Sequence, residues 1–215
     1  MQMDLATTVF ALVVLIISVI IHEVAHGYAA YALGDPTAKL QGRLTLNPLR
    51  HIDPMGSIIV PALLVLTHSG IMFGWAKPVP YNPHNLKNRR WGEAIVGAAG
   101  VATNLLLAVV FALLTRVALG AGMPVYAQAA ATIAFVNLFL GLFNLLPIPP
   151  IDGYTILRGL LPYKYAMSLR SFENRLRSGG LFTLVAFLLL FSYVFAGPFS
   201  VFVNWVFALL VGQPA

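Results

Sequence analysis

Cysteine is absent from this chain of 215 residues, and charged residues make up only 9% of it. The first absence excludes a disulfide framework, a thiolate metal site and a cysteine nucleophile. The second contrasts with the roughly 25% of charged residues in an ordinary soluble domain. Because 59% of the residues are hydrophobic, too little polar surface remains to cover a water-soluble globule. The composition therefore predicts an integral membrane protein.

The net charge of +6 does not indicate a nucleic-acid partner, although the chain is basic. The basic residues occur in short blocks between apolar stretches, which is typical of cytoplasmic loops rather than of a binding groove. The first apolar stretch follows Asp4 instead of a basic region and lacks a small-residue cleavage site, so it does not resemble a cleavable signal peptide. We expect the lipid bilayer, and no nucleic acid, as the environment of this chain.

The apolar runs predict a single polytopic domain over residues 1–215, built as an all-α, multi-pass helical bundle. Each of the first three long runs can cross a hydrocarbon core of about 30 Å. The expected elements are a first helix over 5–33, helices over 94–116 and 125–146, a basic amphipathic surface helix over 163–177, and a C-terminal membrane segment over 179–212. Gly197-Pro198 interrupts the last segment, so its number of crossings stays open.

The region 38–83, between the first two long helices, does not have the pattern of a simple membrane-spanning helix. Lys39–Asn47 and Trp75–Tyr81 alternate in polarity, which predicts a small membrane-associated β element. Pro54–Phe73 is apolar but contains Pro61 and the turn signal His68-Ser69-Gly70. We interpret it as a re-entrant or hairpin segment, because only then do all but one of the thirteen basic residues share one side of the membrane.

The motif His22-Glu23-Val24-Ala25-His26 contains the candidate residues for metal binding and proton transfer. Positions four apart share one face of a helix, so the two imidazoles can bind one zinc ion. Glu23 would then lie beside the metal as a general base that takes a proton from water. The plainer alternative is that these polar residues cap a structural helix, although ionisable groups within an apolar helix are usually functional.

A hydrolytic zinc site usually has a third protein ligand. The candidates are Asp53 and Asp152; the other carboxylates lie at the wrong end of the first helix, in its cap or among basic residues. Asp152 follows a proline-rich stretch and precedes Gly153, which allows a tight turn, but it could instead cap a helix starting at Tyr154. If Pro54–Phe73 does not cross the membrane, Asp152 arrives on the same side as the histidines. Zinc ligation and the basic residues therefore require the same topology.

Two intramembrane asparagines have alternative roles. Asn144 shares a helix face with Asn137 and Gly141, and it either contacts substrate or joins helices by hydrogen bonding. Asn104 follows Gly97 and Gly100 at intervals of about one turn, which indicates close helix packing.

These motifs resemble the site-2 protease family of intramembrane zinc metalloproteases. The resemblance rests on HEVAHG at 22–27 and NLLPIPPIDG at 144–153, and extends to GRLTLNPLRHIDPMGS at 42–57, GWAKPVPYNP at 74–83 and GVATN at 100–104. It implies that His22, His26 and Asp152 bind one Zn²⁺, that Glu23 is the catalytic base, and that Asn144 holds the substrate or the transition state. Val101 departs from the family, whose members often have proline there. The chain is similar to the minimal form, without PDZ or nucleotide-binding domains.

The resulting hypothesis is an intramembrane zinc metalloprotease that hydrolyses peptide bonds of membrane-spanning protein substrates of unknown identity. We expect it in a prokaryotic cell membrane, with its active site towards the cytoplasm. The sequence leaves its oligomeric state open. Two alternatives use the same ligands: a metal-ion transporter, which would need further ionisable residues along a path through the bilayer, and a catalytically silent scaffold, which would have no chemical reason to retain Glu23.

Overall fold

The computed structural model describes residues 5–60, 62, 66, 75–88, 91–180, 183, 186 and 190–212. Within these residues the chain forms helices, turns and extended segments, and no strand. Four helical stretches are long and apolar enough to cross a membrane: α1 (Leu5–Ala32), α4 (Gly92–Gly120), α5 (Pro124–Asn144) and Phe191–Val211, which joins the π-helical turn η4 (Phe191–Phe195) to α9 (Ala196–Val211). The chain is therefore an all-α, multi-pass membrane protein.

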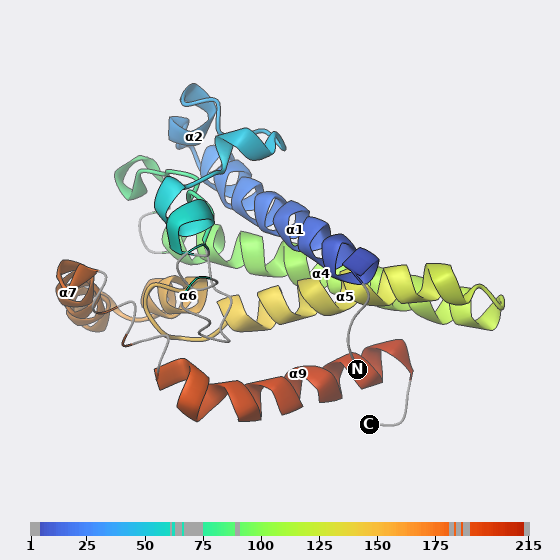
Figure 1. Ribbon diagram of the computed structural model, residues 1–215. Helices are drawn as coiled ribbons and strands as arrows, with labels where there is room; N and C mark the ends of the chain where they lie inside the picture. Colours follow the sequence, from blue (N-terminus) through green and yellow to red (C-terminus); the bar gives the residue numbers. More distant parts are fainter. Residues whose placement is uncertain are drawn as a thin grey trace.

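The centre of the bundle is the antiparallel pair α4 and α5 (Figure 1). Helix α1 crosses this pair, and α9 packs against it on the side away from α1 in this view. Small residues at the contacts allow the backbones to approach closely. Ala108 and Ala112 of α4 and Ala134 of α5 are buried together with Val203 and Val211 of α9.

A tight turn makes α4 and α5 antiparallel. Gly122, between them, has a positive φ of 70°, which glycine adopts without a Cβ clash, and Pro124 occupies the first turn of α5. Arg116 lies near this end of the bundle, where its Nη2 donates a hydrogen bond of 2.6 Å to the carbonyl oxygen of Leu209 near the end of α9.

Asp35 anchors the turn that follows the C-terminal end of α1. Its side chain is fully buried, and its carboxylate accepts hydrogen bonds from the backbone N–H of Asn82 (2.6 Å) and the Asn85 amide (2.8 Å). It also accepts from the hydroxyl of Thr37 (2.5 Å) and from its backbone N–H (3.2 Å). A residue of the turn after α1 is thereby tied to a segment nearly fifty positions later, around η3 (Pro83–Asn85).

Two further helices, α6 (Asp152–Leu160) and α7 (Tyr163–Ser178), pack at the end of the bundle where α1 ends (Figure 1). Arg158 of α6 forms ion pairs with Glu93 of α4 and Glu173 of α7, and Arg170 of α7 also pairs with Glu93. These side chains, except the half-exposed Arg170, are largely buried. The network fixes α6, and the residue at its start, against α4.

The predicted β element is not supported. Lys39–Asn47 begins inside a short helix, α2 (Thr37–Leu40), whose start is fixed by the turn at Asp35. Trp75–Tyr81 has no regular secondary structure and pairs with no strand in the described part of the chain. Pro78 and Pro80 have no N–H to donate.

The predicted re-entrant path of Pro54–Phe73 is not supported either. After η1 (Pro48–Arg50), the described part of this stretch begins with a π-helical turn, η2 (Pro54–Ile59), and most residues beyond position 60 lie outside the described residues. Asp53 caps η2, since its Oδ1 accepts a hydrogen bond of 2.8 Å from the N–H of Gly56.

Candidate metal centre

Three potential ligands converge where α1, α4 and α6 meet. The Nε2 atoms of His22 and His26 are 2.9 Å apart, and both rings are buried. Oδ2 of Asp152 lies 2.9 Å from Nε2 of His22 and 3.3 Å from Nε2 of His26. These are the three residues that the sequence analysis selected, and they come from positions up to 130 apart in the chain.

Both imidazoles are held through their other ring nitrogen. Nδ1 of His26 lies 2.7 Å from the carbonyl oxygen of Val96, and Nδ1 of His22 lies 2.9 Å from Oδ1 of Asn104. A carbonyl oxygen can only accept, so Nδ1 of His26 carries the hydrogen and its Nε2 presents a lone pair. Two ring nitrogens and a carboxylate oxygen that face one another in this way match the ligand chemistry of a zinc ion.

Helix α4 forms the wall behind the two rings. Val96, Gly100 and Asn104 recur every four residues and so lie on one face of α4. A Cβ atom at Gly100 would lie 2.5 Å from Cε1 and Nε2 of His26 and 2.7 Å from Cε1 of His22. Only glycine therefore leaves room for the rings at this position.

Asp152 reaches the histidines from the start of α6. It is the first residue of the helix. The N-cap position is occupied by Ile151, whose side chain makes no capping hydrogen bond. The Asp152 carboxylate contacts the histidines instead of capping the helix that it begins. Gly153 has no room for a Cβ, because the carbonyl of Leu145 lies against it. The other candidate, Asp53, is used as the cap of η2.

Glu23 faces a different neighbour. Its Oε2 accepts a hydrogen bond of 2.8 Å from the backbone N–H of Val79, in the segment 75–82, which has no regular secondary structure. Val79 is flanked by Pro78 and Pro80, so its N–H is the only backbone donor of these three residues. Val79 also packs against Gly27, where a Cβ would lie 2.8 Å from its side chain.

Two buried charged residues hold the segment 75–82 in place. Nη2 of Arg43 donates to the carbonyl oxygens of Lys77 (2.7 Å) and Pro78 (3.3 Å). Asp35 accepts from the N–H of Asn82 on the other side of Val79. Arg43 and Asp35 were not singled out from the sequence, because only the folded chain brings them to this segment.

Asn144 is the last residue of α5 and is half-buried. Its amide Nδ2 donates 2.9 Å to the carbonyl oxygen of Leu140, one turn earlier in the same helix. Asn104, which the sequence analysis assigned to helix packing, is the asparagine that contacts a predicted ligand. Its four-residue spacing from Gly100 and Val96 is the sequence signal that could have placed it on the same face.

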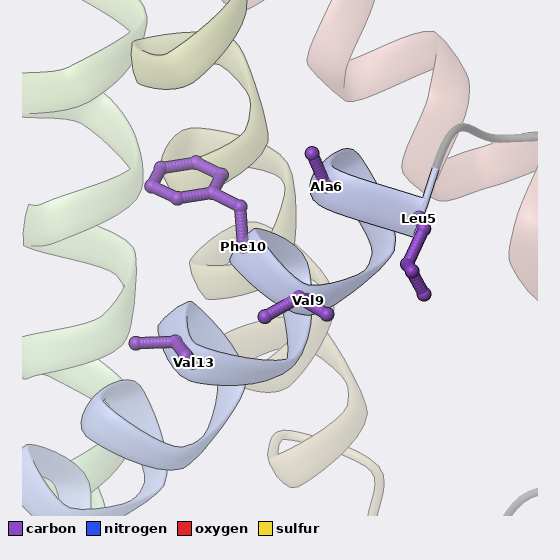
Figure 2. Close-up of a pocket in the computed structure, with 5 residues that line it drawn as sticks. All are labelled: Leu5, Ala6, Val9, Phe10 and Val13. Atoms are coloured by element: carbon purple, nitrogen blue, oxygen red, sulfur yellow. The ribbon is translucent and has the colours of Figure 1, made fainter.

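A hollow elsewhere on the surface is unrelated to this centre. The described residues that line it are in the first turns of α1: Leu5, Ala6, Val9, Phe10 and Val13 (Figure 2). These side chains are apolar and lie at the end of α1 opposite to His22 and His26. They have no group that could bind a metal or transfer a proton.

The fold and the centre define a membrane-embedded metalloprotease, and the comparisons with known proteins agree. The model of "Peptidase family M50" matches residues 121–191. YwhC of Bacillus subtilis, named as a candidate zinc metalloprotease, is 42% identical over 160 residues, which cover 71% of this chain and 69% of YwhC. Rip2 of Mycobacterium tuberculosis strain H37Rv, named in the same way, is 31% identical over 90% of this chain and 71% of its own length.

Rip2 of Mycolicibacterium smegmatis is 36% identical over 68% of this chain and 56% of its own length. No solved structure matches the chain. The chain belongs to peptidase family M50, as the resemblance to the site-2 proteases predicts. It is a metalloprotease, and its cofactor is zinc.

Proposed function

We propose that His22, His26 and Asp152 bind the zinc ion and that Glu23 is the catalytic base for hydrolysis of peptide bonds in membrane-spanning proteins. The observation that carries this proposal is the convergence of two Nε2 atoms and one carboxylate oxygen. Glu23 is next to His22 in the sequence. All four side chains belong to the described part of the chain, and three come from two turns of α1.

The ligand set suits hydrolysis. Two neutral imidazoles and one carboxylate would leave a bound zinc ion with a net positive charge. Zinc held there supplies a Lewis acid that polarises the scissile carbonyl and lowers the pKa of water. The hydrogen bonds to Val96 and Asn104 keep both rings oriented and, in neutral rings, favour the tautomer with hydrogen on Nδ1.

Glu23 moves the proton in this mechanism. One carboxylate oxygen is held by the N–H of Val79, which leaves the other oxygen to accept a proton from the attacking water. Glu23 then delivers this proton to the leaving nitrogen of the cleaved peptide bond. The contact with Val79 fixes the direction in which the carboxylate points while it does so.

The substrate must present an unpaired peptide bond. In a transmembrane helix every carbonyl is already paired within the helix, so the substrate helix has to unwind locally at the centre. Asn144 lies at the end of α5 and would contact the unwound chain or the developing oxyanion. The unwound substrate could in principle pair with Trp75–Tyr81 as an added strand. Around Val79 this pairing is disfavoured, because the Val79 N–H is donated to Glu23 and its neighbours are prolines.

The proposed location is a cell membrane, with the centre towards the cytoplasm. The ion-pair network of α4, α6 and α7 and the buried Arg43 lie at the end of the bundle that carries the centre. Arg116 lies at the opposite end, beside the end of α9. Basic residues are concentrated on the cytoplasmic side of membrane proteins, which favours this orientation.

Zinc analysis of the detergent-purified protein tests the ligands without knowledge of the substrate. We expect about one zinc ion per chain in the wild type, and loss of zinc in His26→Ala and in Asp152→Ala, because two protein ligands bind zinc much more weakly than three. Elemental analysis after dialysis measures this content. Zinc retained in Asp152→Ala would refute the third ligand.

Glu23→Gln separates catalysis from metal binding. The amide keeps the size of the side chain but cannot accept the proton, so we expect unchanged zinc content and cleavage reduced about 10²- to 10⁴-fold. Cleavage is measured with labelled single-span transmembrane peptides in detergent micelles. Full cleavage by Glu23→Gln would refute the assignment of the base.

A further inference from the structure

We infer that Asn104 is a positioning residue for the zinc ion, which acts through His22 rather than through helix packing. This inference rests on the proposed function, since it assumes that His22 is a ligand. Oδ1 of Asn104 lies 2.9 Å from Nδ1 of His22, 82 positions away in the chain. Asn104 has no exposed surface, and the His22 ring is buried, so water does not compete for this contact.

The contact determines which ring nitrogen of His22 carries the hydrogen. A neutral imidazole has one N–H, and metal binding through Nε2 requires that hydrogen on Nδ1. With its Oδ1 towards the ring, Asn104 accepts from Nδ1 and leaves the lone pair on Nε2. The carbonyl oxygen of Val96 has the same role for His26, at 2.7 Å. The backbone of α4 thus sets the tautomer of His26, and a side chain of α4 sets the tautomer of His22.

The surroundings of Asn104 argue against a role in packing alone. Its Nδ2 is buried and has no hydrogen-bond partner in the described part of the chain. Burying an unpaired amide donor destabilises a fold, so an apolar residue would pack at this position with less cost. Among the described residues, the one polar side-chain contact of Asn104 is with His22, which explains why an asparagine is placed there.

Asn137 provides the comparison within the same bundle. It is a buried asparagine of α5, and its Nδ2 donates to Oγ of Ser18 (3.0 Å) and to the carbonyl oxygen of Ile133 (2.9 Å). Ser18 lies one turn before His22 on α1. Asn137 therefore joins α5 to α1 through its bond to Ser18, and its bond to Ile133 stays within α5, whereas Asn104 contacts a proposed ligand.

The test measures zinc affinity by competition with a chelator of known affinity, on full-length protein in detergent. Asn104→Leu removes the acceptor, and we expect zinc to bind about 10- to 100-fold more weakly, as for the loss of other hydrogen bonds to metal ligands. Asn104→Asp retains an oxygen acceptor for Nδ1 and should restore the affinity to within about threefold of the wild type. The matched variant Asn137→Leu should also stay within about threefold.

Thermal unfolding of the zinc-free proteins monitors folding separately. Asn104→Ala and Asn137→Ala form a second pair if the leucine variants do not purify. Equal losses of zinc affinity at positions 104 and 137, or no rescue by Asn104→Asp, would overturn the inference. A wild type that binds zinc as tightly as Asn104→Leu would overturn it too, while a wild type without zinc would instead overturn the proposed ligands.

Discussion

Two sides of the same turns of α1 are held in different ways. His22 and His26 face α4, where a backbone carbonyl, an asparagine and a glycine on one helix face determine their position. Glu23 faces the segment 75–82 and accepts a hydrogen bond from the backbone N–H of Val79. The proposed metal ligands on α1 therefore depend on helix packing in the bundle. The proposed base depends on a segment that two buried charged residues contact.

The difference indicates that zinc binding and proton transfer can be disrupted separately. Damage to the α4 side should remove zinc, and activity with it. Damage to the segment should impair Glu23 while the zinc ion stays bound. Gly100→Ala and Arg43→Met should separate the two effects, and Asp35→Asn should change stability.

Gly100→Ala should disrupt the histidine side most severely. Its Cβ would lie 2.5 Å from Nε2 of His26, so the ring must move and a ligand is displaced. We expect zinc affinity to fall about 100-fold and cleavage to be lost with it. The control is Gly120→Ala in the same helix, where a Cβ meets nothing within 4 Å. If both variants bind zinc as the wild type does, α4 does not constrain the rings.

Arg43→Met should disrupt the segment side. It removes the donor to the carbonyl oxygens of Lys77 and Pro78, so the N–H of Val79 loses its fixed position against Glu23. We expect cleavage to fall about 10- to 100-fold, since small displacements of a catalytic group have effects of this size. Zinc content should not change.

The control for Arg43→Met is Arg50→Met, because Arg50 is exposed in η1. Cleavage of transmembrane peptides and zinc content are measured on the same preparations. Loss of zinc in Arg43→Met would show that the two sides of α1 are not separable.

Asp35→Asn should have the smallest effect, on stability and its pH dependence. Burial favours a raised pKa for Asp35, but the hydrogen bonds from Thr37, Asn85 and the Asn82 backbone outweigh it and lower the pKa. A lowered pKa in the folded state stabilises the protein above the unfolded-state pKa of about 4, and this contribution is lost as the pH falls through the folded-state value.

We therefore expect Asp35→Asn to be less stable than the wild type by about 1–3 kcal/mol at pH 7, with the difference shrinking below about pH 4. Unfolding in detergent at a series of pH values measures this. A stability difference that grows as the pH falls would contradict the assigned direction of the pKa shift.

Much of the architecture could be predicted from the sequence, because long uncharged runs have few alternatives to membrane helices. The motif at His22–His26 could be recognised from its spacing alone. Asp152 was one of two candidates on the residues alone, and the family resemblance favoured it over Asp53. The structure brings these three residues together. The cap alternative for Asp152 is not what the structure shows.

The partner of each segment could not be predicted. The alternation in Trp75–Tyr81 predicts a strand, but this segment has no regular secondary structure, and its hydrogen bonds include those to Glu23 and Arg43. Alternation in Lys39–Asn47 was overridden by the turn at Asp35, which starts α2. Likewise, local sequence does not tell which face of α4 meets α1, so Asn104 was assigned to packing when it contacts His22.

The 130 positions that separate His22 from Asp152 have a consequence for synthesis of the protein. The two proposed histidine ligands are made early, on the first helix, but the proposed third ligand, Asp152, is made only after two more long helices. Two histidines alone are a weak zinc site. With this ligand set, the nascent chain would therefore complete its zinc site only after most of its long helices have been made.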